Sequence, residues 1–128
     1  MKKLALVLVA LLTMVFTGCK TETSKVTVHV EDTLGAPVAD RLVFYADWAS
    51  LIIGEVLPSP EELVLDYNDS WEYAETNKSG KVDIIIPLSL SKLSYVFAVY
   101  DRGSNQWIKE TRELHRGQNE EIKFEVNK

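Results

Sequence analysis

The sequence is poor in the residue types on which many catalytic and metal sites depend. Its 128 residues include one cysteine, Cys19, and two histidines, His29 and His115, which are far apart in the chain. Structural zinc sites need clustered cysteine and histidine ligands, and a catalytic triad needs a base between a nucleophile and an acid. A Gly-x-Ser-x-Gly motif and a glycine-rich phosphate loop are both missing. The sequence therefore predicts a non-catalytic protein without a metal or a cofactor.

Two weaker patterns of acidic residues do not change this prediction. Asp66, Asn68 and Asp69 offer oxygen atoms, but the run has no glycine inside it and no glutamate at the twelfth position of a calcium loop. An Asx-rich turn explains these residues as well. The pairs Glu61/Glu62 and Glu120/Glu121 are adjacent, so in a strand their members face opposite sides and do not form an acid–base pair.

Basic residues are also scarce, with 14 lysines and arginines against 19 aspartates and glutamates. Lys2 and Lys3 account for two of the basic residues, so residues 19–128 hold 12 basic and 19 acidic residues, a net charge of −7. Nucleic-acid binding requires basic patches, so this balance argues against a nucleic-acid partner. It also argues against close contact with anionic lipid headgroups.

The sequence has no apolar run long enough to cross a bilayer. The longest one, Leu4–Phe16, is 13 residues and would span about 20 Å as a helix, against a hydrocarbon core of roughly 30 Å. It follows Lys2 and Lys3, and it precedes the small residues Thr17 and Gly18 and then Cys19. A charged start, a short apolar run and small residues before a cut site are typical of a secretory signal peptide. A permanent membrane helix and an unlipidated signal peptide are the alternatives.

With cysteine as the first residue after the cut, residues 1–20 resemble the lipobox signal peptide of bacterial lipoproteins. The resemblance implies cleavage between Gly18 and Cys19, a lipid on the Cys19 thiol and a protein tethered to a membrane. Phe16 departs from the leucine that is usual at its position. Lys20 favours the outer membrane of a Gram-negative cell, because an aspartate there is the common signal for retention at the inner membrane. The domain then faces either the periplasm or the outside.

The rest of the chain has the pattern of an all-β domain. Val26, Val28 and Val30 alternate with polar residues, which predicts a half-buried strand. Similar runs, separated by turn residues, predict strands at 41–46, 71–76, 81–87, 95–100, 106–113 and 121–126. We expect the strands at 71–76 and 81–87 to form a hairpin around Gly80. Residues 114–119 are expected to form a turn.

The expected fold is a single antiparallel β-sandwich of about seven or eight strands, either prealbumin-like or immunoglobulin-like. The predicted organisation is a cleaved signal peptide at 1–18, a lipidated Cys19 with a polar tether to residue 24, and a sandwich at 25–128. Residues 47–70 form an excursion whose path stays open. Ser59–Glu62 has a helix start with a proline at its first position, whereas Leu63–Leu65 favours a strand.

Two segments carry a second resemblance. Residues 28–38 (VHVEDTLGAPV) and 74–82 (AETNKSGKV) resemble the turn motifs of carboxypeptidase-regulatory-like domains, which have prealbumin topology. Tyr95–Val99 is similar to a later strand of these domains, whereas Asn77 stands where they usually have aspartate. The resemblance implies a fold and no active site, because such domains are mostly spacers or interaction modules.

Aromatic residues are the remaining candidates for a binding surface. A platform for a sugar ring or a partner protein is expected from four of them, namely Trp48, Tyr67, Trp71 and Trp107. Aromatic residues in strands also serve cross-strand packing, which is the alternative for each. The sequence therefore predicts a membrane-anchored interaction module that binds another envelope protein or, as the alternative, a glycan-binding module. An apolar groove that displays tryptophan would favour the glycan.

Overall fold

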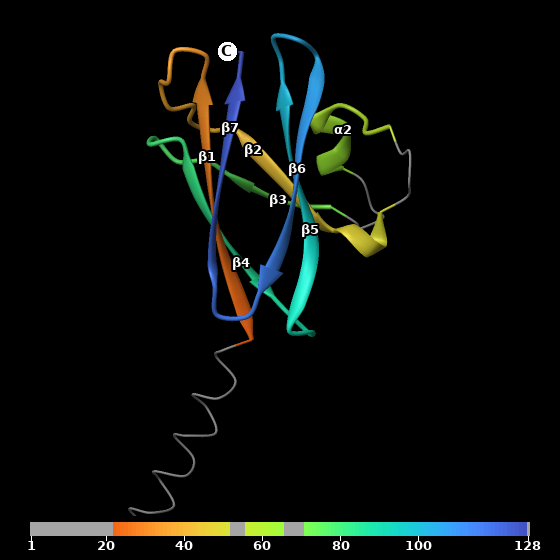
Figure 1. The fold of residues 1–128 in the computed structure, drawn as a ribbon. Coiled ribbons are helices and arrows are strands. Elements are labelled where there is room, and N and C mark those ends of the chain that lie inside the picture. Colours follow the sequence, from red (N-terminus) through yellow and green to blue (C-terminus); the bar gives the residue numbers. More distant parts are fainter. Residues whose placement is uncertain (1–21, 52–55, 66–70, 128) are drawn as a thin grey trace, which may run out of the picture.

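The computed structural model describes residues 22–51, 56–65 and 71–127, and in these residues the expected all-β sandwich is confirmed (Figure 1). The predicted signal peptide at 1–18, Cys19 and Tyr67 lie outside the described residues. The strands are β1 (Thr23–Asp32), β2 (Leu42–Asp47), β3 (Glu72–Glu75), β4 (Lys81–Pro87), β5 (Lys92–Asp101), β6 (Gln106–His115) and β7 (Asn119–Val126). Two short helices follow β2, the 3-10 helix η2 (Trp48–Ser50) and the α-helix α2 (Pro60–Val64).

The strands form two sheets that face each other. One has three strands in the order β4-β1-β7, and the other has four in the order β3-β2-β5-β6. All neighbouring strands are antiparallel except β1 and β7, which pair in parallel from Lys25 and Asn119 to Asp32 and Val126. The antiparallel sandwich that the sequence predicts is therefore confirmed, and it includes this one parallel pair.

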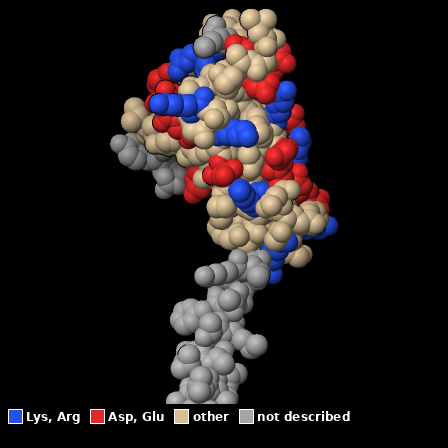
Figure 2. Space-filling view, turned by 90° about the vertical axis from the view of Figure 1, so that its left-hand side faces the viewer, with Lys and Arg blue, Asp and Glu red and all other residues tan. Residues whose placement is uncertain are grey.

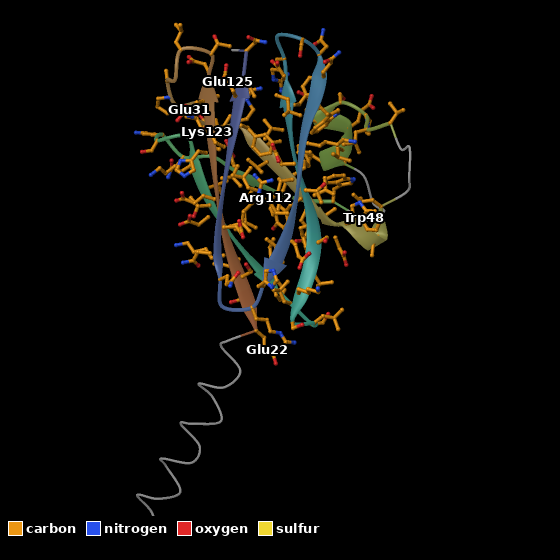
Figure 3. All side chains as sticks on the ribbon, in the orientation of Figure 1. Glu22, Glu31, Trp48, Arg112, Lys123 and Glu125 are labelled. Carbon is orange, nitrogen blue, oxygen red and sulfur yellow. The ribbon has the colours of Figure 1, made fainter. Side chains whose placement is uncertain are left out.

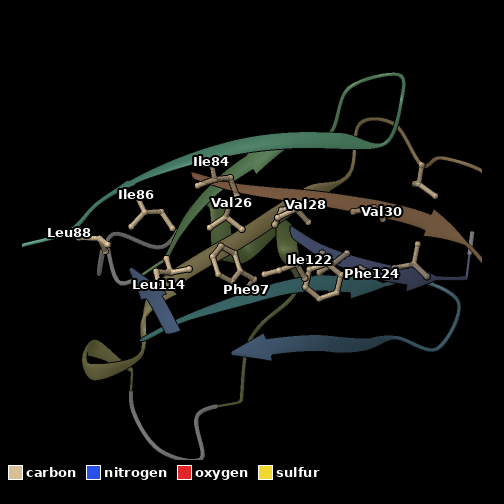
Figure 4. Packing of buried hydrophobic residues seen from close by; sticks show 14 residues of the cluster. Val26, Val28, Val30, Ile84, Ile86, Leu88, Phe97, Leu114, Ile122 and Phe124 are labelled. Atoms are coloured by element: carbon tan, nitrogen blue, oxygen red, sulfur yellow. The ribbon is translucent and has the colours of Figure 1, made fainter. Parts of the chain in front are cut away.

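The core lies between the two sheets, as the alternation in the sequence predicts. Val26, Val28 and Val30 of β1 are completely buried and point towards the four-stranded sheet, from which Phe97 projects (Figure 4). The other labelled members of this cluster are Ile84, Ile86, Leu88, Leu114, Ile122 and Phe124. Burial of a valine or a larger apolar side chain contributes roughly 1.5–3 kcal/mol, so this cluster is the main stabilising feature.

The expected hairpin of residues 71–76 and 81–87 is wrong. β3 pairs with β2, and β4 pairs with β1, so the two strands belong to opposite sheets. The turn between them carries the chain across the sandwich. Asn77 closes it by accepting hydrogen bonds at its side-chain oxygen from the backbone N–H groups of Ser79 and Lys81. Gly80 has φ +70° and donates its N–H to the carbonyl of Asn77.

Two strands extend beyond their expected bounds. β1 begins at Thr23, so Thr23 and the buried Ser24 belong to the sheet, although the sequence places both in a polar tether. β6 continues to His115, and Leu114 is completely buried, although both residues were expected in a turn. In each case hydrogen bonds to a neighbouring strand or turn extend the ladder; one of them runs from the Gly117 N–H to the Thr23 carbonyl at 2.9 Å.

Of the excursion at 47–70, the described part that includes α2 covers part of the outer face of the four-stranded sheet. Ser59 accepts a hydrogen bond from the Glu62 N–H at the start of α2, and Pro60 is the first helical residue. Leu63, for which the sequence favours a strand, is buried within this helix and packs on Phe44 and Ala98. The sheet thus has an apolar cluster on each of its faces.

The C-terminal end of β7 is fastened to the turn between β5 and β6. Asp101 is buried, and its carboxylate accepts hydrogen bonds from the N–H and the side-chain amide of Asn127, at 3.1 Å each. It accepts two more from the Gly103 N–H and the Ser104 hydroxyl, at 3.0 Å each. Burial alone would raise the pKa of Asp101, but these hydrogen bonds outweigh burial and lower the pKa.

Candidate functional site

A groove lies on the outer face of the four-stranded sheet, where the cover formed by η2 and α2 is incomplete. Its volume is about 510 Å³. The floor consists of outward-facing residues of two strands, Val96 of β5 and Lys109 and Thr111 of β6, and the walls are Trp48, Ala49, Leu51 and Trp71. The groove is therefore mainly apolar, with one cationic group and one hydroxyl, a composition common in ligand sites.

Trp48 is the most accessible aromatic residue of the groove. It is the first residue of η2, and 56% of its surface is exposed, at the side of the sandwich opposite β1 (Figure 3). The helix is held by Asp47, whose side chain accepts a hydrogen bond from the Ala49 N–H at 3.1 Å. An indole held on a capped turn presents a rigid apolar surface, which is the feature that ring stacking requires.

Trp71 lies immediately before β3 and is partly buried against the cluster of Phe44 and Leu63. Its indole Nε1 is buried and has no hydrogen-bond partner in the described part of the chain. A buried donor left without a partner costs about 1–3 kcal/mol. Trp71 therefore adds an unmet polar group beside the groove, in addition to its apolar ring.

The other two predicted platform residues are not shown in the groove. Trp107 packs edge-on against Phe44 and Tyr100, at centroid distances of 5.4 and 5.3 Å, and its Nε1 donates to the Pro58 carbonyl at 3.1 Å. It therefore supports the segment before α2. Tyr67 lies outside the described residues. The structure thus brings together Trp48 and Trp71 of the four predicted residues.

Sequence reasoning missed the floor of the groove. Lys109 and Thr111 follow Trp107 at every second position of β6, so the period of two places all three on one face. That signal was present in the sequence. What was missing was the pairing of β5 with β6, in which Val96 lies opposite Thr111.

The two histidines lie in different sheets. His29 of β1 has Nε2 at 3.8 Å from Oε1 of Glu121, and His115 of β6 has Nε2 at 3.4 Å from Oε1 of Glu113. Within the residues that the structure describes, no group of three potential ligands could hold a metal ion. The candidate calcium ligands at 66–69 fall in a range that the structure does not describe.

The outer face of the three-stranded sheet has a different character from that of the four-stranded sheet. Positive and negative side chains alternate on this side of the molecule (Figure 2). Ion pairs link neighbouring strands, including Lys25 with Asp83 at 3.7 Å and Lys123 with Glu31 at 2.9 Å. Exposed pairs contribute little stability, about 0–1 kcal/mol each, so this face is mainly a solvated surface.

The fold and the groove define the chain as a β-sandwich domain with a candidate binding groove. No protein-family model matches the sequence, and no curated protein matches it. Of the helices in residues 22–51, 56–65 and 71–127, none has the length and apolar character to cross a membrane.

Proposed function

We propose that this protein is a non-catalytic lipoprotein of the bacterial outer membrane, and that its sandwich is a binding module of the cell envelope. The observation that carries the binding role is the groove walled by Trp48 and Trp71. An apolar groove of about 510 Å³ on a rigid sheet is a typical setting for a ligand. The anchor is supported by the lipobox pattern that ends at Cys19.

The start of β1 supports a short connection to the membrane. Three residues lie between Cys19 and Thr23, where β1 begins, so the connection has four Cα–Cα steps and is at most about 14 Å long. The Thr23 carbonyl accepts a hydrogen bond from the Gly117 N–H, and the Glu22 carbonyl accepts one from the Leu88 N–H, so the loops near these residues share this end of the sandwich (Figure 1). The proposal therefore places this end next to the lipid.

We further propose that the sandwich belongs to the carboxypeptidase-regulatory-like group with prealbumin topology. The first of the two segments that resemble this group contains a tight turn. Asp32 accepts hydrogen bonds from the N–H groups of Leu34 and Ala36, at 2.9 Å each, and Gly35 has φ +83°. Pro37 bridges back to Glu31. This turn, at the position of the motif, supports the proposed resemblance at the level of fold.

The anchor is tested by expressing the wild type and Cys19→Ala in a Gram-negative host and separating membranes with detergent. We expect the wild type to incorporate labelled palmitate and to enter the detergent phase, and Cys19→Ala to do neither. A palmitate label on Cys19→Ala, or equal partition of both proteins, would refute lipidation at this residue. Protease added to intact cells then distinguishes a surface-facing domain, which is digested, from a periplasmic one, which is protected.

A glycan is the second candidate ligand, and the exposed Trp48 favours it. Stacking of a sugar ring on an accessible indole, with Lys109 and Thr111 as polar neighbours, would use every kind of group in the groove. The test is a titration of the detergent-solubilised protein with oligosaccharides, followed by tryptophan fluorescence. Trp48→Ala should abolish the response, whereas Trp107→Phe, which leaves the groove lining intact, should retain it. A response that survives Trp48→Ala would remove the glycan from this groove.

A further inference from the structure

Four polar side chains occupy positions at which the strands point into the sandwich. On β2, Tyr45 and Asp47 follow the buried Val43 at every second residue. Register places Glu72 of β3 opposite Tyr45, and Tyr95 of β5 opposite Asp47. Polar residues at inward positions are informative, because such positions otherwise hold the apolar core.

These four residues line a cleft at one edge of the sandwich. Its volume is about 210 Å³, and the opposite side is formed by the end of β4, with Ile85, Ile86 and Pro87. β4 is an edge strand, and Ile85 is 58% exposed. The cleft therefore has an apolar side on one sheet and a polar, aromatic side on the other. It is separate from the groove walled by Trp48 and Trp71, because the two cavities share no lining residue.

The polar side of the cleft carries two carboxylates that no cation of the described residues balances. Among these residues, lysine and arginine are absent from the lining of the cleft, and neither Asp47 nor Glu72 forms an ion pair. Burial raises the pKa of Tyr45, and the charge and hydrogen-bond acceptance of Glu72 raise it further. Burial also raises the pKa of Tyr95, followed by the charges of Asp47 and Glu72. Both phenols are therefore neutral at pH 7.

We propose that this cleft binds the primary ammonium group of a lysine side chain from a partner protein. The carboxylates of Asp47 and Glu72 would accept its hydrogen bonds, and the rings of Tyr45 and Tyr95 provide the electron-rich surfaces that attract cations. The methylene stem of lysine would lie along Ile85 and Pro87, as such stems do on apolar surfaces. An amino sugar fits less well, because its ring hydroxyls would face an apolar side without partners.

The test uses the detergent-solubilised full-length protein and Nα-acetyl-lysine amide as the probe, followed by nuclear magnetic resonance of backbone amides. We expect saturable shifts at residues of the cleft, and no such shifts with Nα-acetyl-norleucine amide, which has the stem without the charge. Glu72→Gln should weaken binding by about tenfold, the loss expected for one charge-assisted contact. Glu75→Gln changes an exposed carboxylate of the same strand and should leave binding unchanged.

Three results would overturn the proposal. The first is equal binding of the norleucine probe, which would make the site apolar. The second is equal weakening by Glu72→Gln and Glu75→Gln, which would indicate a general effect of negative charge. The third is binding of glucosamine at least as tight as that of the lysine probe, which would change the ligand class. If Glu72→Gln disturbs folding, Tyr95→Phe is the second variant to measure. It keeps the aromatic ring, so it should retain most of the affinity for the lysine probe.

Discussion

Gly80 provides the sharpest test of how this fold crosses from one sheet to the other. We predict that Gly80→Ala lowers the free energy of unfolding by about 2–4 kcal/mol. One part is the positive φ of +70°, which costs an alanine roughly 1 kcal/mol. The larger part is steric: a Cβ on Gly80 would lie 2.6 Å from the Val30 carbonyl oxygen and 3.0 Å from the Val38 nitrogen. Both are backbone atoms, and such overpacking costs about 1–3 kcal/mol.

Gly35 is the matched control for this prediction. It has φ +83°, and a Cβ there would meet nothing within 4 Å. Gly35→Ala should therefore cost about 1 kcal/mol or less, because reduced freedom of the unfolded chain offsets part of the strain. Urea unfolding of both variants, followed by tryptophan fluorescence, measures the difference. Equal losses for the two variants would refute the close packing of the Asn77–Gly80 turn on Val30.

Three further predictions concern stability. Asp101→Asn should cost about 1.5–3 kcal/mol in urea unfolding at pH 7, because the charged acceptor of four hydrogen bonds is lost. The folded state lowers the pKa of Asp101, so the Asp101 carboxylate stabilises the fold fully above roughly pH 4, and this stabilisation is lost as the pH falls through the folded pKa. The difference in unfolding free energy between wild type and Asp101→Asn should therefore shrink at pH 2. A difference that stays constant with pH would contradict this. Val28→Ala should cost about 2 kcal/mol by the same assay, and a loss below ~0.5 kcal/mol would mean that β1 is not central to the core. Trp107→Phe should cost about 1 kcal/mol, because the carbonyl of Pro58 loses its donor, and an unchanged midpoint would contradict that hydrogen bond.

The strands could be predicted from the sequence where alternation was regular. Val26, Val28 and Val30 gave the buried face of β1 correctly, and the strand predicted at 121–126 corresponds to most of β7. Such positions depend only on a period of two, which is local. The exact bounds of β4, Lys81–Pro87, were also recovered, because turn residues flank this strand.

Pairing between strands could not be predicted, because it depends on contacts between distant residues. The turn at Asn77–Gly80 has the composition of a hairpin turn, but Gly80 packs on Val30 and sends the chain to the opposite sheet. The parallel pairing of β1 with β7 likewise joins the two ends of the domain and has no local signal. The candidate groove was only half predicted for the same reason, since Trp48 and Trp71 were identified without Val96, Lys109 and Thr111.

In the described part of the chain, the residue patterns of the two sheets explain why the groove lies on the outer face of the four-stranded sheet. β1 alternates apolar and polar residues, so its outer face needs no cover. β2 and β5 contain continuous apolar runs, with Phe44 and Ala98 pointing outward, so the four-stranded sheet must be covered on both faces. Leu63 of α2 packs over Phe44 and Ala98, but Val96 remains on the floor of the groove beside Trp48. The outer face of the four-stranded sheet is apolar and only partly covered, so an apolar site remains open on it. For this reason we propose that this face has the binding role.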